Sequence, residues 1–332
     1  MTALSRTADE LSAALRMVEE DAASSAEKAE MLMEIAMGLQ QKPKEADDIF
    51  AAIELYSQGV AMCGEGDALL GARIRARMAT ALMALPGEDL APLEQAKSEL
   101  QQALAILADQ GSGEEIAEAE MNLGLALQTL AGAHRARIQD AISAYQRSLR
   151  VFDKRAHPRE FAILHNNLAT AFLSISMAGD AGKVREALAV QSFEEGLSAV
   201  NIIDQPMEYA MLQNNLGNAL QYASSSHRVE NGFRALEAYD EALRVRDPGH
   251  APLEYANTIA NKANCLANLP DDPENANSGN PRNIANAIKL YREAAAIFAR
   301  MGAVDRADAA TEAMMELDAA VRATPAHANG GF

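Results

Sequence analysis

Residues 208–220 read EYAMLQNNLGNAL, and the same pattern returns 46 residues later as EYANTIANKANCL at 254–266. Within each copy, apolar residues recur at the helical period. Four earlier copies precede these at offsets of 48, 45, 45 and 43 residues: EFAILHNNLATAF (160–172), EIAEAEMNLGLAL (115–127), LGARIRARMATAL (70–82) and EKAEMLMEIAMGL (27–39). Six copies at a nearly constant spacing predict a repeat architecture for residues 25–300.

Each copy is followed by a second helical segment that carries small residues and Tyr or Leu at helical spacing. DAISAYQRSLRVFD at 140–153 and RALEAYDEALRVRD at 234–247 are two examples. Turn-forming stretches such as PGED (86–89) and MAGDAG (177–182) separate the segments. No long stretch alternates with the period of a β-strand. The sequence therefore predicts an all-α chain of antiparallel helix pairs, in which each pair packs on the next.

The two ends of the chain lie outside the repeats. We expect residues 1–24 to form an N-terminal capping helix and residues 301–324 to form a C-terminal one. The last residues, 325–332, are expected to be a disordered tail.

Charge and cysteine usage narrow the class of partner and the compartment. The net charge is −18, and residues 1–67 hold 14 Asp and Glu against 5 Lys and Arg. Because phosphate binding needs a basic face, this balance argues against nucleic acid and favours a neutral or basic protein partner, unless the acid serves only solubility. The two cysteines lie far apart in sequence and cannot form a disulfide framework, so a reducing cytoplasm is expected. No signal core and no apolar window long enough for a membrane span is present, so a cytoplasmic protein without a membrane partner is expected.

The helix pairs resemble tetratricopeptide repeats (TPR). The residues that carry the resemblance are N-L-G-N-A at 215–219, N-L-G-x-A at 122–126 and N-L-A-x-A at 167–171. The long period is similar to two TPR subtypes, the kinesin light chain type and the bacterial arrays found beside caspase-like CHAT protease domains. Tyr209 and Phe161 stand where the bacterial pattern has Trp. The resemblance implies a right-handed superhelical α-solenoid of about six repeats, with the first helix of each pair lining a concave groove.

Asparagines gather on the first-helix face that the resemblance directs into the groove. Each carboxamide offers two donors and an acceptor, so a ladder of them can pair with the N–H and C=O groups of an extended peptide. Alternatively, the amides bond neighbouring helices or are merely solvated. The candidate partner-binding residues on this face, including two arginines, are Asn122, Asn167, Asn215, Asn218, Asn257, Asn261, Asn264, Asn268, Arg73 and Arg77.

The two arginines of this set share one face of the second copy. Arg73 and Arg77 could clamp a carboxylate or another acidic group of a ligand. The alternative is that they pair with Glu34 and Glu118 of the adjacent repeats.

No catalytic motif is apparent. None of the six histidines has a second ligand at metal-like spacing, and there is no phosphate-binding glycine loop and no G-x-S-x-G. We therefore expect a non-enzymatic chain without cofactor or metal. The leading interpretation is a scaffold, adaptor or assembly chaperone that binds a polypeptide in the groove. The alternative is a regulatory sensor that binds a small molecule or signalling peptide there.

Overall fold

The structure is a computed structural model that describes residues 11–13, 15–16, 18, 22–44, 47–176, 179–224, 227–275 and 277–323. Most of the N-terminal capping helix expected over residues 1–24, and all of the tail expected over 325–332, lie outside the described residues. Contacts between residues group the chain into two compact units, Met1–Asp153 and Lys154–Phe332.

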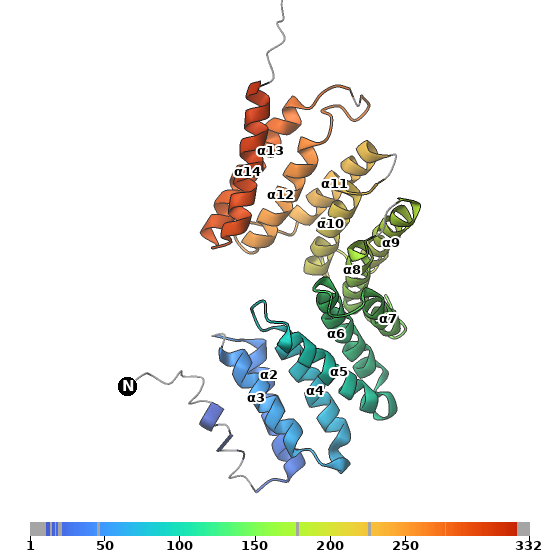
Figure 1. Cartoon of the computed structure of the whole chain (residues 1–332), viewed down its shortest axis with the longest axis vertical. Helices are drawn as coiled ribbons and strands as arrows, with labels where there is room; N and C mark the ends of the chain where they lie inside the picture. Colours follow the sequence, from blue (N-terminus) through green and yellow to red (C-terminus); the bar gives the residue numbers. More distant parts are fainter. Residues whose placement is uncertain are drawn as a thin grey trace, which may run out of the picture. The chain divides into compact units, whose positions relative to one another are not determined.

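The N-terminal unit is a stack of three helix pairs (Figure 1). Each second helix packs on its own first helix, and α3 and α5 also pack on the first helix of the next pair. The first helices α2, α4 and α6 are neighbours in the stack. The pairs are α2 (Ser25–Gln41) with α3 (Asp47–Met62), α4 (Ala68–Met83) with α5 (Ala91–Gln110), and α6 (Gly113–Gly132) with α7 (Ile138–Ser148).

The C-terminal unit holds three more pairs and one further helix. Proline opens four of its helices, where the fixed φ of the ring suits the first helical turn. The last helix, α14, packs on α13 in the region expected to form the C-terminal cap. The elements are α8 (Pro158–Ser174), α9 (Gly179–Leu197), α10 (Pro206–Gln221), α11 (Arg228–Leu243), α12 (Pro252–Ala267), α13 (Pro281–Arg300) and α14 (Val304–Ala323).

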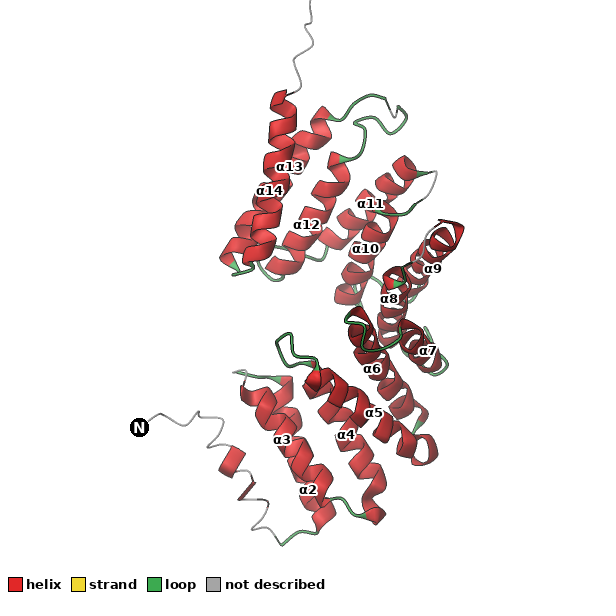
Figure 2. Cartoon of the chain, viewed as in Figure 1, coloured by secondary structure: helices red, strands yellow, loops and turns green. Residues whose placement is uncertain are grey.

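All regular structure in the described residues is helical, and Figure 2 shows no strand among them. The predicted all-α, TPR-like array of antiparallel helix pairs is therefore confirmed. One boundary differs, because α9 begins at Gly179, inside the stretch 177–182 that was expected to be a break. The positive N-terminal end of the helix stabilises the carboxylate of Asp180, which also pairs with Lys183 at 3.2 Å.

A glycine against a tyrosine sets the distance between the two helices of a pair. A Cβ placed on Gly124 would lie 2.4 Å from Cε1 of Tyr145, and one on Gly217 would lie 2.6 Å from Cε1 of Tyr239. Both tyrosines are fully buried. The glycine of the N-L-G pattern is therefore needed because the aromatic ring of the second helix occupies the place of its side chain.

The buried tyrosines also make a repeated hydrogen bond that sequence reasoning missed. In three pairs the phenolic hydroxyl of the second helix donates to a Gln near the end of the first helix. The bonds run from Tyr56 to Gln40 (2.9 Å), from Tyr145 to Gln128 (2.8 Å) and from Tyr239 to Gln221 (2.9 Å). Burial raises the pKa of Tyr56 to about 12. The recurrence of Gln at the same place in the first, third and fifth copies was the available signal.

No helix in the described part of the chain is long and apolar enough to cross a membrane.

Candidate functional site

A chain of asparagine amides crosses the three first helices of the C-terminal unit. Asn261 of α12 donates to Oδ1 of Asn214 at 3.3 Å, and Asn214 donates to Oδ1 of Asn215 at 3.0 Å. Asn215 of α10 donates to Oδ1 of Asn166 at 2.8 Å, and Asn166 donates to Oδ1 of Asn167 at 3.2 Å. Every amide of the chain is thus engaged head to tail with the next. The chain connects α12 to α10 and α10 to α8.

Burial divides these five amides into two kinds. Asn166 and Asn214 are only 8% exposed and lie where neighbouring first helices meet. Asn167, Asn215 and Asn261 are half-buried, on the side that we call the first-helix face of the C-terminal unit. The hydrogen bonds with Asn166 and Asn214 use one N–H group and one oxygen lone pair of the Asn215 amide. Its second N–H group and its second lone pair are not used by this network. The network therefore fixes the orientation of these amides while leaving part of their hydrogen-bonding capacity.

The remaining candidate asparagines of the C-terminal unit also have partners within that unit. Oδ1 of Asn218 lies 2.7 Å from the hydroxyl of Tyr239, whose single hydrogen is shared between Asn218 and Gln221. Asn264 donates to the hydroxyl of Tyr222 at 2.5 Å, and Asn268 donates back to the carbonyl oxygen of Asn264 at 2.8 Å. Tyr222 is 66% exposed, which makes it a large aromatic surface beside the amides. The Asn264–Tyr222 contact joins α12 to the end of α10, and the Asn218–Tyr239 contact joins α10 to α11.

The remaining asparagine of α12 meets the last helix. Asn257 accepts from a guanidinium nitrogen of Arg306 at 3.3 Å, and the same guanidinium lies 5.5 Å from the ring centroid of Phe298. Arg306 belongs to α14, so the terminal helix supplies the neighbour of the first asparagine in the stripe 257, 261, 264 and 268. Sequence reasoning did not identify Arg306, because nothing in its local pattern indicates a contact with a helix 49 residues away.

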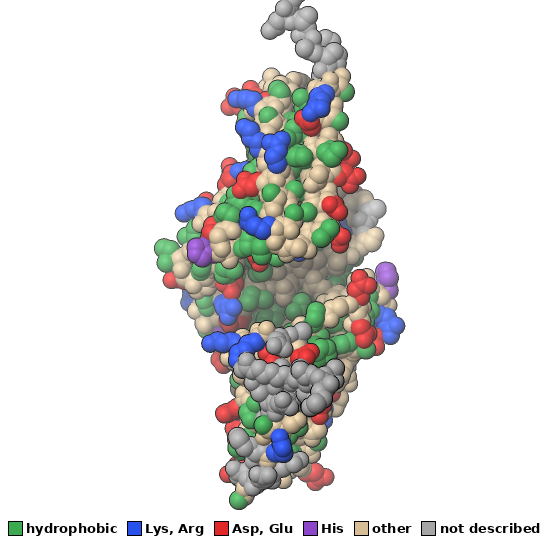
Figure 3. All heavy atoms as spheres, turned by 90° about the vertical axis from the view of Figure 1, so that its left-hand side faces the viewer, with side chains coloured by type: hydrophobic (Ala, Val, Ile, Leu, Met, Phe, Trp, Pro, Cys, Tyr) green, Lys and Arg blue, Asp and Glu red, His purple; other side chains and the backbone are tan. Residues whose placement is uncertain are grey.

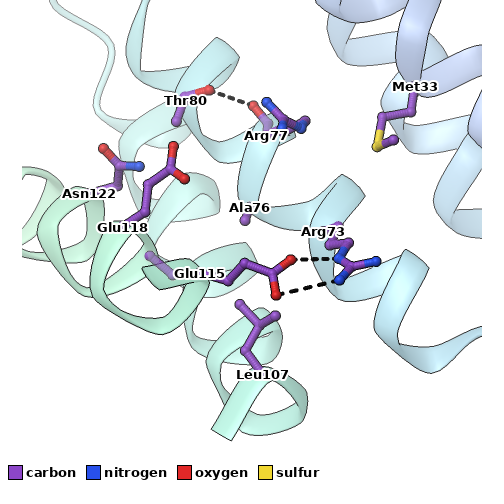
Figure 4. Close-up of a pocket in the computed structure, with 10 residues that line it drawn as sticks. Met33, Arg73, Ala76, Arg77, Thr80, Leu107, Glu115, Glu118 and Asn122 are labelled. Carbon is purple, nitrogen blue, oxygen red and sulfur yellow. Dashed lines mark hydrogen bonds and ion pairs between the residues drawn. The ribbon is translucent and has the colours of Figure 1, made fainter. Parts of the chain in front are cut away.

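In the N-terminal unit, Arg73 is already paired. It forms a bidentate pair with Glu115, with Nε to Oε1 at 2.5 Å and the second contact at 3.4 Å (Figure 4). The hydrogen bond to Arg73 lowers the pKa of Glu115, and the same bond raises the pKa of Arg73. The alternative partners considered for Arg73, Glu34 and Glu118, are therefore corrected to Glu115.

Arg77 differs from Arg73 in this respect. Its backbone carbonyl accepts from Thr80 at 2.7 Å, but its guanidinium makes no hydrogen bond or ion pair with any described residue. It lines a hollow of about 200 Å³ together with Glu118 and Asn122 of α6 and Met33 of α2. Figure 4 shows Glu118 and Asn122 on one side of this hollow, Met33 on the other, and the side chains of α4 between them.

The asparagine doublets are the residues that sequence reasoning used only in part. It placed Asn167 and Asn215 on the first-helix face, but it did not single out their predecessors, Asn166 and Asn214. These buried neighbours complete the hydrogen-bond chain. The N-N doublet in two successive copies was the available signal, and the sixth copy has Ala260 in place of the first asparagine.

The described residues show no metal centre, and the face drawn in Figure 3 shows no broad basic surface. The described residues contain no group of three or more His, Cys, Asp or Glu side chains placed to hold a metal ion. On the face shown in Figure 3, acidic and basic side chains are interspersed with hydrophobic and uncharged ones. Nothing on that face resembles the continuous basic stripe that phosphate binding needs.

Comparison with known proteins found similarity among solved structures. No family model matches the sequence, and no curated protein matches it at a significant level. The chain is similar to BtubC (BKLC) from P. vanneervenii, with 15% identity, a TM-score of 0.39, and coverage of 99% of this chain and 97% of that one.

Two further solved structures are similar at comparable levels. The TPR2AB domain of yeast Sti1, in its complex with pHSP90, shares 15% identity at a TM-score of 0.34, covering 87% of this chain and 98% of that one. The apo form of the quorum sensor NprR from B. thuringiensis shares 11% identity at a TM-score of 0.35, covering 94% and 87%. The TM-scores of these three structures all lie below 0.5.

Proposed function

We propose that the protein is a non-catalytic scaffold that binds a partner polypeptide on the first-helix face of its C-terminal unit. The observation that supports this proposal is the amide chain from Asn261 to Asn167, which runs across three successive helices. Hydrogen-bonded amides of this kind present donors and acceptors in fixed orientations, so little side-chain entropy is lost when a ligand binds.

The spare hydrogen-bonding groups suit a polypeptide backbone. Asn167 keeps both N–H groups, Asn261 keeps both lone pairs, and Asn215 keeps one N–H and one lone pair beyond the network. An extended segment offers N–H and C=O groups along its length, and both kinds of group find a complement here. Recognition through the backbone depends little on the partner's sequence, which suits a scaffold, adaptor or assembly chaperone.

The charge of the face supports a neutral or basic partner segment. The residues at the groove-directed positions of α8, α10 and α12 are all uncharged, although the whole chain carries a net charge of −18. They comprise Ile163, Asn167, Thr170, Ser174, Met211, Asn215, Asn218, Tyr222, Asn257, Asn261, Asn264 and Asn268. Nothing at these positions would repel an uncharged backbone, and the acidic excess of residues 154–332, with 22 Asp and Glu against 16 Lys and Arg, favours basic flanking residues. We place this activity in the cytoplasm, in keeping with two unpaired cysteines.

Selection of peptides from a random display library, panned on the purified full chain, tests the proposal. Enriched peptides are synthesised with a fluorophore, and their dissociation constants are measured by fluorescence anisotropy. Asn167→Ala and Asn261→Ala each remove one end of the amide chain. Each is expected to weaken binding about three- to tenfold, since one hydrogen bond contributes about 1 kcal/mol.

The matched control is Gln191→Ala, which removes an exposed carboxamide from α9, a second helix of the same unit. Peptide affinity should be unchanged in this variant. Failure to enrich any peptide contradicts the proposal. So does a set of peptides whose affinity is the same for wild type, Asn167→Ala and Asn261→Ala. Circular dichroism confirms that each variant is folded before its affinity is compared.

A further inference from the structure

The hollow in the N-terminal unit contains two opposite charges that are not paired with each other. Arg77 of α4 and Glu118 of α6 both line it and both are exposed, yet they form no ion pair. The carboxylate of Glu118 and the amide of Asn122 likewise make no hydrogen bond with a described residue. By contrast, the neighbouring Arg73 is fully engaged by Glu115. The hollow is thus lined by a guanidinium, a carboxylate and an amide that have no partner among the described residues.

Inter-helix bonds involve the first and the last residue of α4 that line the hollow. Arg73 of α4 is tied to Glu115 of α6. Gln40 of α2 donates to the hydroxyl of Thr80 of α4 at 2.8 Å. Arg73 and Thr80 are seven residues apart in one helix, which corresponds to about 10 Å at 1.5 Å per residue. Because Arg73 and Thr80 are the outermost lining residues of α4, the hollow is short along this helix, which suits a compact ligand.

We propose that this hollow binds a small zwitterion of the amino-acid class, with its carboxylate on Arg77 and its ammonium group on Glu118. A guanidinium offers two parallel N–H groups to a carboxylate, and a carboxylate accepts from an ammonium group. The amide of Asn122 can pair with either end of the ligand. This site is separate from the polypeptide-binding face proposed for the C-terminal unit, and neither depends on the other.

The two charges of the hollow explain why a zwitterion fits better than a simple ion. A ligand with a carboxylate alone would pair with Arg77 but would place its charge near the like charge of Glu118. A ligand with an ammonium group alone would have the reverse conflict with Arg77. Only a ligand with both charges compensates both side chains. A ligand with one charge is disfavoured because that charge lies near a side chain of the same sign.

The volume and lining restrict the rest of the ligand. A hollow of about 200 Å³ is below the range of drug-sized sites, which is roughly 300–1,000 Å³. Met33 and Ala76 add an apolar surface beside the charged groups, as Figure 4 shows. A short aliphatic amino acid satisfies both conditions, because it carries the two charges and a small apolar side chain.

Isothermal titration calorimetry on the full chain tests the proposal. The probes are alanine, β-alanine and γ-aminobutyrate, which separate the two charges progressively, with propionate and propylamine as analogues that carry one charge each. We expect saturable binding of at least one zwitterion at millimolar concentration. Propionate and propylamine should bind at least about tenfold more weakly, the effect of losing one charge-assisted pair.

Two variants and two controls assign the binding to this hollow. Arg77→Gln and Glu118→Gln should each weaken the preferred zwitterion at least about tenfold. Arg150→Gln and Glu88→Gln remove equivalent exposed charges elsewhere in the N-terminal unit and should leave the affinity unchanged. The proposal is overturned if no zwitterion binds at millimolar concentration, if the single-charge analogues bind equally well, or if both hollow variants bind like wild type. Peptide binding by the C-terminal unit is measured separately, so each proposal can fail without the other.

Discussion

Asn215 of α10 donates a hydrogen bond to Oδ1 of Asn166 in α8 at 2.8 Å, across two successive repeats. The acceptor is 8% exposed, so the bond lies at the helix interface and not on the open surface. Asn214 donates to Asn215 from the preceding position and itself accepts from Asn261 of α12. The N-N doublet therefore has two roles, with one amide buried between repeats and the next one held in a fixed orientation at the face.

Replacing Asn215 should destabilise the C-terminal unit. In Asn215→Ala, the buried amides of Asn166 and Asn214 each lose a partner. An unsatisfied buried polar group costs about 1–3 kcal/mol, so we expect the free energy of unfolding to fall by about 1–3 kcal/mol. Urea unfolding followed by circular dichroism measures the change as a lower midpoint.

Asn264→Ala is the matched control for this loss. Asn264 donates to the hydroxyl of Tyr222, which is 66% exposed and can bond to water instead. The free energy of unfolding should therefore fall by less than about 0.5 kcal/mol. Equal midpoints for Asn215→Ala and wild type would show that the inter-repeat amide chain contributes nothing to stability.

Two glycines in first helices should respond to alanine in opposite directions. At Gly217 a new Cβ would meet the ring of Tyr239 at 2.6 Å, so Gly217→Ala should destabilise by about 1–3 kcal/mol despite the better helix propensity of alanine. At Gly38 in α2 nothing lies within 4 Å of the new Cβ. Gly38→Ala should therefore stabilise by about 0.5–1 kcal/mol. Thermal unfolding of both variants is the measurement, and stabilisation by both would refute the close contact.

The helix pairs could be predicted from the sequence because their determinants are local. The apolar period is repeated in all six copies, so each copy supports the others. The partners of polar side chains could not be predicted, because they depend on how neighbouring helices are offset. Arg73 selects Glu115 because Ser112 already holds that carboxylate at the start of α6, with Ser112 N to Oε2 at 2.9 Å.

Alkaline pH should weaken the fold through its buried tyrosines. Burial raises the pKa of Tyr56 to about 12 in the folded chain, whereas an unfolded tyrosine ionises near 10. The raised pKa means that the stabilisation is fully present below about pH 10 and is lost as pH rises towards 12. The loss reaches about 2–3 kcal/mol, at 1.36 kcal/mol per pKa unit.

Tyr56→Phe separates this effect from the hydrogen bond that the hydroxyl makes to Gln40. Removing that bond lowers stability by about 1 kcal/mol at neutral pH. Removing the titrating group should also make the free energy of unfolding fall less steeply between pH 10 and 12. Urea midpoints measured across this range give both quantities. An unchanged slope in Tyr56→Phe would mean that Tyr56 ionises equally well folded and unfolded.

The two cysteines should differ in reactivity, and they lie in different units. Cys265 is 1% exposed, its thiol donates to the carbonyl oxygen of Gly232 at 3.3 Å, and burial raises its pKa to about 12. Cys63 is half-buried, and burial raises its pKa as well. Because the thiolate is the reactive species, a disulfide reagent at mildly alkaline pH should modify Cys63 slowly and Cys265 only when the C-terminal unit opens.

This difference makes Cys265 a reporter of the amide chain. In a Cys63→Ser background only Cys265 remains, and its modification rate gives the free energy of opening when reclosing is fast. Adding Asn215→Ala should speed the reaction about tenfold for each 1.4 kcal/mol of stability that is lost. Adding Asn264→Ala should change the rate by less than about threefold, in line with its smaller cost. A Cys265 that reacts at the same rate in all three proteins would show that its exposure does not require separation of α10 from α8 and α12.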